Sequence, residues 1–504
     1  MEKPKVRISV RNLVEFILRS GDLDNSRGSS GDKEAMLKGG RLHRKIQRSM
    51  KGNYQAEVSL KRESEYEDVI IQVEGRADGI FTEDGEFWID EIKGTYGNLQ
   101  AMEVPVPVHR AQAMCYGWIY GEKEGLSQIG IQMTYSHLDT EDTRRFREIF
   151  SMEELKNWYQ KLLDDYHKWI SCSLSWKKER NASMKDLQFP FPYREGQREI
   201  VSGVYHTVSS KKTLFVQAPT GVGKTMSAIF PSVRAIGEGK GETLFYLTAK
   251  TITGTVAWEA FHTLRENGLK FKVTAITAKE KLCFLDSPEC TPEKCPYAKG
   301  HFDRVNDAVY ELWTTEEVYS REVIRAHAEK WQVCPFEMCL DLSVWVDGVI
   351  CDYNYAFDPN VHLKRFFGEN ISGDYIFLID EAHNLVERGR EMYSAEISRQ
   401  TLFTLRKKIR KHFPKLARAL DKASRQMLEL EEDLKASQNP YQVLSNPGVL
   451  PVTFLTISGE LEEILEEKNL EEELRKEILE FYFVVRDFLN VSELVDENYV
   501  VYTE

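Results

Sequence analysis

The stretch Ala218-Pro219-Thr220-Gly221-Val222-Gly223-Lys224-Thr225 decides the fold that we expect for much of this chain. An apolar run, Leu214–Val216, precedes it, and a run that can form a helix, Met226–Phe230, follows it. A strand, a glycine-bearing loop, a Lys-Thr pair and a helix together match the phosphate-binding P-loop, with alanine in place of the usual first glycine. Glycines let backbone N–H groups approach a phosphate, and a helix N-terminus favours its negative charge. The stretch therefore predicts a nucleoside triphosphate site, with Lys224 at the β- and γ-phosphates and Thr225 on Mg²⁺.

Composition limits the kind of protein. A chain of 504 residues with 42% hydrophobic and 29% charged residues is typical of a soluble protein of about two to four domains. No signal peptide or membrane-spanning run is visible, so we expect a cytoplasmic protein with no membrane partner. A net charge of −13 argues against indiscriminate coating of nucleic acid, although it leaves room for a local basic groove. The eight cysteines indicate thiols or metal ligands rather than disulfides.

Two further features suit a nucleotide-binding domain. Gln197 comes shortly before the predicted P-loop strand, where its amide can pair with an adenine edge and favour ATP; a helix N-terminal turn is the alternative, and both can hold. The apolar run Tyr375–Ile379 is followed by Asp380 and Glu381, and Asp380 would hold Mg²⁺ beside a P-loop. Strands interleaved with helices predict a parallel sheet with ligands at the carboxyl ends of its strands.

The N-terminal part carries a second set of polar residues. Two strands, Val69–Phe81 and Phe87–Lys93, are predicted around a turn at Glu83-Asp84-Gly85. They carry Asp78 on one strand and Glu91 and Lys93 on one face of the other. Converging carboxylates can hold a divalent metal, and a neighbouring lysine can orient water and stabilise charge on a phosphate under attack.

The order of these residues resembles the PD-(D/E)xK nucleases of the RecB type. The similar features are His43 in a predicted helix, Asp78, Glu91-Ile92-Lys93, and Gln112-x-x-x-Tyr116. The resemblance implies that His43, Asp78 and Glu91 bind Mg²⁺ or Mn²⁺, that Lys93 is catalytic, and that Gln112 and Tyr116 organise the site or the DNA strand. Taken separately, the E-x-K is typical of a solvated charge pair, and the other residues of an ordinary helix surface. Because this part holds only Cys115 and Cys172, we expect no iron–sulfur cluster within it.

Four cysteines lie between the P-loop and Asp380. Cys283, Cys290 and Cys295 fall in one short stretch, and Cys334 follows later. Four thiolates can hold a 4Fe-4S cluster or zinc. Zinc favours closer pairs than these, which places it second.

An insertion with four cysteines before Asp380-Glu381-Ala382-His383-Asn384, together with Asp352-Tyr353-Asn354-Tyr355, resembles the XPD/DinG (Rad3-like) superfamily 2 DNA helicases. The resemblance implies a 4Fe-4S cluster on Cys283, Cys290, Cys295 and Cys334, and Cys339 could replace one of these ligands. Cys351, inside the apolar run Val349–Cys351, is predicted to lie in the core. The resemblance also implies that Glu381 activates water, that His383 couples the nucleotide site to the DNA site, and that Thr248–Thr251 touches the DNA backbone. Single-stranded or forked DNA and movement from 5′ to 3′ are implied as well.

We therefore expect an α/β protein with three parts. A nuclease domain occupies 1–180, ending at the charged segment 177–181, and a RecA-like domain occupies 181–390 with an iron–sulfur insertion at 275–345. A helical segment at 391–504 resembles the Arch domain of the family. The second RecA-like domain of the family, with its arginine finger, is not recognisable, so we expect an amino-terminal part of a longer protein that hydrolyses ATP poorly.

Three functions remain open at this point. The first is an ATP-dependent DNA helicase fused to a metal-dependent nuclease, acting in DNA repair or processing. The second is a nuclease with an ATP-binding gate. The third is an iron–sulfur DNA-binding module whose nuclease residues are inactive.

Overall fold

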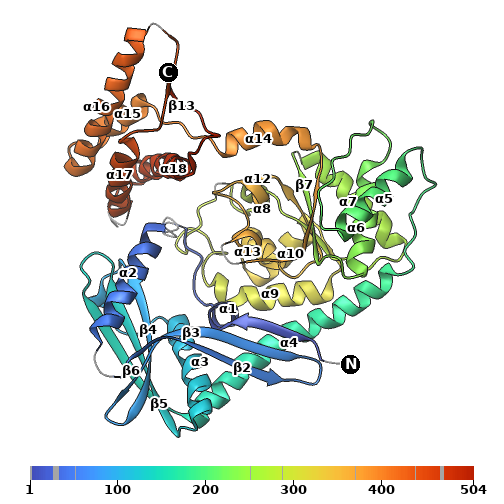
Figure 1. The fold of residues 1–504 in the computed structure, drawn as a ribbon, viewed down its shortest axis with the longest axis horizontal. Helices are drawn as coiled ribbons and strands as arrows, with labels where there is room; N and C mark the ends of the chain where they lie inside the picture. The colour runs from blue at the N-terminus through green and yellow to red at the C-terminus, as the bar shows by residue number, and fades with distance from the viewer. Residues whose placement is uncertain are drawn as a thin grey trace. The chain divides into compact units, whose positions relative to one another are not determined.

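The structure is a computed structural model that describes residues 3–25, 33–50, 53–249, 251–286, 288–368, 371–437, 439–465 and 470–504 (Figure 1). Internal contacts divide the chain into two compact units. The first comprises Met1–Leu244, Ala257–Val349 and Asp374–Ile376, and the second comprises Phe245–Val256, Ile350–Gly373 and Phe377–Glu504. Among the described residues, no helix combines the length and apolar character that a membrane crossing needs.

A six-stranded sheet forms the N-terminal part of the first unit. Its path is β1-β3-β4-β5-β6, and β2 pairs with β3. The pairs β1–β3 and β4–β5 are parallel, whereas β2–β3, β3–β4 and β5–β6 are antiparallel. The strands are β1 (Lys5–Ser9), β2 (Gln55–Glu65), β3 (Ile70–Glu83), β4 (Glu86–Thr95), β5 (Gln128–His137) and β6 (Thr143–Ser151).

The predicted hairpin of this sheet is confirmed. Strands β3 and β4 meet at a tight turn in which Asp84 (φ +51°) and Gly85 (φ +83°) both adopt the left-handed conformation. Such a turn matches the twist of the strands that flank it, and glycine adopts it without strain. Asp78 therefore lies on β3, and Glu91 and Lys93 lie on β4, as the alternation predicted.

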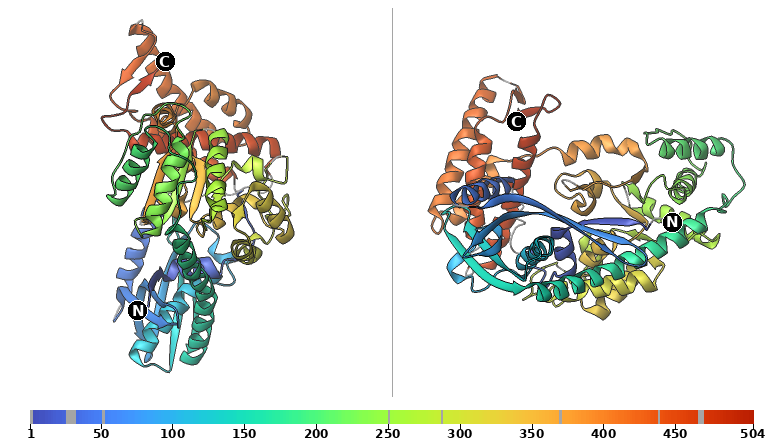
Figure 2. Two further views of the ribbon diagram at one scale, coloured as in Figure 1. Left: turned by 90° about the vertical axis from the view of Figure 1, so that its right-hand side faces the viewer. Right: turned by 60° about the horizontal axis from the view of Figure 1, so that its bottom comes forward.

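Four helices accompany this sheet: α1 (Val10–Ile17), α2 (Lys33–Ser49), α3 (Pro107–Glu124) and α4 (Met152–Met184). Ser9 caps α1, and Ser151 and Glu154 form a capping box at the start of α4. The core contains apolar side chains of α1, α3, α4 and the sheet. Figure 2 shows α4 as one long, uninterrupted helix in both views.

A second sheet has the strand order β11-β7-β10-β8-β9, and β8 and β9 are parallel. The mixed α/β fold that we predicted is confirmed. The strands are β7 (Thr243–Thr248), β8 (Val273–Ala275), β9 (Val318–Tyr319), β10 (Gly348–Asp352) and β11 (Tyr375–Ile379). The helices between them are α5 (Gln197–Ser209), α6 (Lys224–Gly237), α7 (Thr251–Glu266), α8 (Lys279–Leu282), α9 (His301–Thr315), α10 (Arg321–Trp331), α11 (Pro335–Leu342), α12 (Asn354–Phe357) and α13 (Lys364–Phe367).

One predicted strand is absent. Residues Leu214–Val216 were expected to form the buried strand before the P-loop, but they have no strand conformation, and Phe215 is 87% exposed. An apolar run becomes a strand only where a neighbouring strand accepts and donates its backbone hydrogen bonds. Within the described residues, this run pairs with no other strand.

The C-terminal part of the second unit is helical, as predicted. Its helices α15, α16, α17 and α18 enclose a separate hydrophobic core that includes Leu405, Phe454 and Val485. The elements of this part are the 3₁₀ turn η2 (Ala382–Asn384), α14 (Leu385–Met392), α15 (Arg399–Ile409), α16 (Pro414–Ser437), α17 (Leu450–Leu465), α18 (Glu472–Leu494) and the antiparallel pair β12 (Gln442–Leu444) and β13 (Val501–Thr503).

The last turns of α4 attach to the second sheet through a buried ion pair. The helix continues through the charged segment 177–181, where we placed a domain boundary that stays a prediction. Arg180 is 4% exposed, and its Nη1 donates to Asp347 Oδ1 at 2.7 Å. The Trp176 indole donates to Asp347 Oδ2 at 2.8 Å. Charged side chains at the end of α4 therefore serve as an anchor.

We expect the Asp347→Ala substitution to lower the free energy of unfolding of the first unit by about 3–5 kcal/mol, because the Arg180 guanidinium would be left buried without its carboxylate. Chemical denaturation followed by tryptophan fluorescence measures this change. The control is Glu63→Ala, which removes the exposed ion pair with Lys5 and should leave stability unchanged. Equal midpoints for the two variants would contradict the anchoring role.

Candidate functional site

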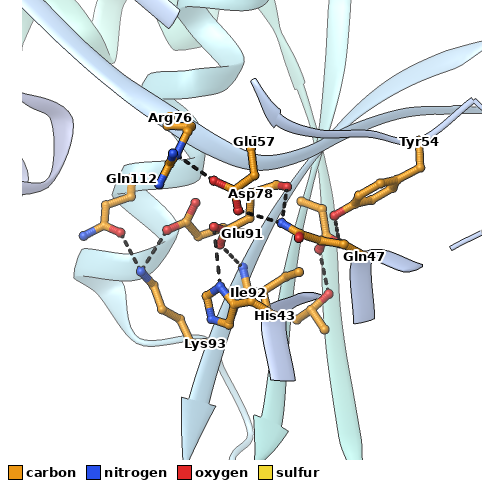
Figure 3. Close-up of polar contacts among 12 residues, drawn as sticks. His43, Gln47, Tyr54, Glu57, Arg76, Asp78, Glu91, Ile92, Lys93 and Gln112 are labelled. Atoms are coloured by element: carbon orange, nitrogen blue, oxygen red, sulfur yellow. Dashed lines mark hydrogen bonds and ion pairs between the residues drawn. The ribbon is translucent and has the colours of Figure 1, made fainter. Parts of the chain in front are cut away.

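The predicted nuclease residues lie where β3 and β4 separate (Figure 3). The β3–β4 ladder ends at the pair Gly79 and Asp90, and β4 continues beyond it beside β5. The separation frees the N–H of Ile92, which donates to Asp78 Oδ2 at 2.7 Å. A side-chain carboxylate thus replaces a missing backbone partner, which fixes Asp78 at the fork between the strands.

Glu91 and Lys93 face helix α3 from β4. Lys93 Nζ lies 2.8 Å from Glu91 Oε1 and donates to Gln112 Oε1 at 2.9 Å. Gln112 is 3% exposed, so this acceptor is held firmly. Tyr116, one helical turn later, places its hydroxyl beside the main chain at Gly75, where a Cβ would lie 2.7 Å from that oxygen. The structure therefore brings these four predicted residues together.

His43 reaches the fork from helix α2. Its Nδ1 lies 3.6 Å from Asp78 Oδ1. The helix is held there because Leu42 and Ile46 pack against Ile92 of β4. All six predicted nuclease residues thus surround one region of the sheet. They come from helix α2, from strands β3 and β4, and from helix α3.

The electrostatics at the fork suit a cation. Burial, opposed by Lys93 and reinforced by Asp78, raises the pKa of Glu91 to about 7. Glu91 Oε2 is buried and has no hydrogen-bond partner in the part of the chain that the structure describes. An imidazole and two carboxylates form a donor set that fits Mg²⁺ or Mn²⁺. Among the described residues, no three His, Cys, Asp or Glu side chains already gather within reach of one ion, so a metal would draw these ligands closer.

Three residues at the fork were not predicted. Glu57 lies on β2 between the pairs Ala56–Gly79 and Val58–Ala77, opposite Asp78, and its φ is +57°. Its carboxylate binds Arg76 Nε at 2.6 Å and accepts from Gln47 Nε2 at 2.9 Å. Gln47 also donates to the carbonyl of Asp78, so this network ties α2 to β3. A left-handed residue inside a strand leaves the alternation of the sequence unchanged, which explains why sequence reasoning missed this network.

A second network supports the fork from the other face. Asp90 is fully buried, and it accepts hydrogen bonds from Thr134 at 2.6 Å, Gln132 at 3.0 Å and Tyr54 at 3.1 Å. Burial raises its pKa, and these donors oppose the shift. The Tyr54 ring crosses Gly79, where a Cβ would lie 1.9 Å from its hydroxyl oxygen, so only glycine fits there.

The predicted phosphate-binding loop leads into helix α6. Gly221 (φ +88°) and Gly223 (φ +81°) adopt left-handed conformations that other residues rarely take. Lys224 begins α6, and its Nζ donates to the Ala218 carbonyl at 3.1 Å. Thr225 is the second residue of the same helix. The lysine amino group therefore lies against the loop itself.

Gln197 braces this loop. It begins helix α5, is 4% exposed, and donates from Nε2 to the Val222 carbonyl at 2.8 Å. Its Oε1 accepts from the N–H of Arg194 at 2.9 Å. Both ends of the amide are thus engaged by the protein, and contact with an adenine edge stays a prediction.

The acidic pair after β11 belongs to the second unit. The N–H of Asp380 donates to Leu247 O at 2.9 Å, and the Tyr353 hydroxyl donates to the carbonyls of Asp380 and Glu381. Glu381 has a φ of +50°, a conformation that costs non-glycine residues of the order of 1 kcal/mol and that clusters at functional sites. His383 Nδ1 lies 3.3 Å from Glu381 Oε2. Lys250, predicted at the DNA backbone, lies outside the described residues.

The four predicted cluster cysteines line one cavity in the first unit, with mainly apolar neighbours. Cys295 and Cys334 are each 7% exposed. Cys283 Sγ accepts from the N–H of Leu285 at 3.4 Å. Burial raises the pKa of Cys334 to about 11, while nearby backbone N–H groups oppose the shift. The lining residues are Leu23, Cys283, Phe284, Leu285, Glu289, Cys290, Cys295, Tyr297, Ala298, Cys334 and Pro335.

The four cysteines share one cavity, whereas Cys339 and Cys351 lie apart from it. All four thiols line this cavity, and among the described residues no three of them already gather around one metal position. Cys339, the proposed substitute, lies elsewhere, with its sulfur 3.7 Å from Thr274 Oγ1. Cys351 is buried in β10, as predicted. Four thiols are a donor set that suits a 4Fe-4S cluster or zinc.

Several known proteins are similar to parts of this chain. The DEAD_2 family model matches residues 264–402. A probable ATP-dependent helicase of Methanocaldococcus jannaschii is 40% identical over 201 residues, which are 39% of this chain and 29% of that protein. The general transcription and DNA repair factor IIH helicase subunit XPD of Arabidopsis thaliana is 22% identical over 255 residues, 44% of this chain and 33% of that protein.

A solved structure titled XPD helicase aligns with 60% of this chain and 51% of its own, at 18% identity and a TM-score of 0.38. The matches to curated relatives span between 7% and 33% of the length of those proteins. The chain is thus similar to helicases over part of its length, and the DEAD_2 match covers residues 264–402.

Proposed function

We propose that this chain carries the motor part of an ATP-dependent DNA helicase together with a metal-dependent DNA nuclease domain, acting in DNA repair or processing. The observation that carries the helicase proposal is the DEAD_2 match over 264–402, which includes the four cavity cysteines and Asp380–His383. Single-stranded or forked DNA and movement from 5′ to 3′ follow from the resemblance alone.

The nucleotide roles follow from the chemistry of each segment. Lys224 and the N–H groups at the start of α6 would bind phosphate oxygens, and Thr225 would hold Mg²⁺. Gln197, which bonds the Val222 carbonyl, would keep the loop open for this purpose. In the second unit, Asp380 would hold Mg²⁺ and Glu381 would orient the attacking water.

The nuclease proposal depends on the fork between β3 and β4. Its main support is the buried Glu91 oxygen without a partner, beside Asp78 and facing a lysine that Gln112 holds. His43, Asp78 and Glu91 would hold Mg²⁺ or Mn²⁺, which would activate water and stabilise charge on the scissile phosphate. The Lys93 ammonium, fixed between Glu91 and Gln112, would stabilise the negative charge that develops on the phosphate.

We expect Lys93→Ala to reduce Mg²⁺- or Mn²⁺-dependent cleavage of single-stranded DNA by about a hundredfold or more, because a preorganised charge at the reacting phosphate is removed. ATP binding should be unchanged, since Lys93 lies on β4 and is not part of the loop at 218–225. Cleavage is measured on end-labelled DNA. The control is Lys123→Ala, an exposed lysine of α3, and full cleavage by the Lys93 variant would refute the nuclease proposal.

For Lys224→Ala we expect a loss of ATP affinity of about 10- to 100-fold, since hydrogen bonds to charged groups contribute about 1.5–3 kcal/mol. Titration with a fluorescent ATP analogue measures the dissociation constant. Lys240, an exposed residue after α6, provides the matched control Lys240→Ala. Unchanged affinity in the Lys224 variant would exclude the P-loop assignment, whereas cleavage that needs ATP in the native chain would favour the gated nuclease.

Anaerobic purification should give a brown protein with about four irons per chain, as ligation by four thiolates implies. Metal analysis and the visible absorption spectrum measure this. Cys295→Ser should abolish the absorption and Cys339→Ser should retain it, because only the first lines the cavity. One zinc per chain instead of iron would overturn the assignment.

A further inference from the structure

A segment of the N-terminal part covers the cysteine cavity, although nothing in the sequence suggested such a contact. We call Arg19–Asn25 the cover segment; it follows helix α1. Leu23 is 7% exposed and forms one hydrophobic cluster with Cys295, Ala298 and Cys334. Its side chain is thus one wall of the cavity that the four cysteines line.

The backbone of the cover segment is bonded to the cysteine-bearing loop. The N–H of Leu23 donates to the Ala298 carbonyl at 2.9 Å, and the N–H of Asn25 donates to the carbonyl of Cys290 at 2.9 Å. Two donors of the segment therefore hold the chain on either side of Cys295. This pairing fixes the depth at which Leu23 enters the cavity.

Side chains of the cover segment and of the cysteine-bearing part also hydrogen-bond to each other's main chain. Asp22 Oδ1 accepts from the N–H of Gly300 at 2.6 Å, and the carboxylate of Asp303 accepts from the N–H of Gly21 at 2.8 Å. Arg19 bonds Asn306 Oδ1 and lies 2.8 Å from Asp341, with 19% and 8% of the two charged side chains exposed. A partly buried ion pair surrounded by reciprocal hydrogen bonds is a specific contact rather than a chance approach.

Aromatic packing extends the contact to the nuclease core. Phe16 of α1 lies 5.1 Å from Trp169 of α4 and 5.6 Å from Trp345, measured between ring centroids. Trp169 in turn lies 4.6 Å from Trp345 and stacks on Trp313 of α9. Trp169 and Trp313 are 3% and 1% exposed. Helices α1 and α4 therefore pack both into the core of the first sheet and against the aromatic side chains of the cysteine-bearing part.

We infer that the cover segment seals the iron–sulfur site, so that the N-terminal nuclease part controls solvent access to the cluster. The inference rests on the proposed function, since it requires a cluster on the four cysteines. The apolar shell around a metal site governs water access and the stability of the bound metal. Among the described residues that line the cavity, Leu23 comes from outside the cysteine-bearing insertion, which couples retention of the cluster to the docking of the N-terminal part.

The test uses the whole chain, purified anaerobically with its cluster. Iron release to a coloured Fe²⁺ chelator is followed together with the loss of visible absorption. We expect Leu23→Ala to speed release about tenfold, by analogy with the effect of outer-shell substitutions on metal retention. Leu23→Met, which keeps an apolar side chain of similar volume, should release iron at the native rate. Ile149→Ala, at an exposed position of β6, is the control in the same domain.

A second variant keeps the test decisive if Leu23→Ala does not fold. Asp22→Ala removes the bond to Gly300 without entering the cavity, and faster iron release in this variant would support the cover role. Release at the native rate from both variants, with iron content intact, would overturn the inference while leaving the proposed cluster in place. A native protein that contains no iron would overturn the proposed cluster itself, and the inference with it.

Discussion

The Asp347 carboxylate is the buried charge around which the first unit is assembled. Its Oδ1 accepts from Arg180, and its Oδ2 accepts from the Trp176 indole and from the main chain of Lys272. Its own carbonyl accepts from the N–H of Leu244 on β7. A buried carboxylate is tolerated only when its oxygens are satisfied, so the end of α4, the approach to β8 and the start of β7 must be in place together. The ion pair thus couples the N-terminal part to the second sheet.

The helix that ends at this carboxylate also explains how the cysteine-bearing insertion depends on the N-terminal sheet. Helix α4 contributes apolar side chains to the core of the first sheet, and farther along it presents Trp169 to Trp313 and Trp345. Helix α1 contacts the same aromatic group through Phe16 and continues into the segment that contains Leu23. Two helices therefore fix the position of one wall of the cysteine cavity, and a rigid packed core transmits any displacement of them.

Local patterns predicted the elements that depend only on nearby residues. The turn at Asp84-Gly85 and the alternation that carries Glu91 and Lys93 were visible in the sequence, as was the spacing of the cavity cysteines. The failures have a non-local cause. Leu214–Val216 has strand composition but no strand partner in the described residues, and composition cannot reveal a missing partner. Leu23 escaped notice because its contact with the cysteines depends on the packing of α1, not on any pattern around it.

Two adjacent acids on β4 show why residue type alone does not assign a role. Asp90 is fully buried, but Thr134, Gln132 and Tyr54 donate to it, so its environment is complete. Glu91, on the opposite face of the strand, is bonded through one oxygen and leaves the other buried without a partner among the described residues. Burial penalises the ionised form of both carboxyl groups. Only at Glu91 can an added cation relieve that penalty without breaking an existing hydrogen bond, because the second oxygen is uncommitted. The fork between β3 and β4 is therefore built to receive positive charge, and the neighbouring acid is built to hold the strands that form it.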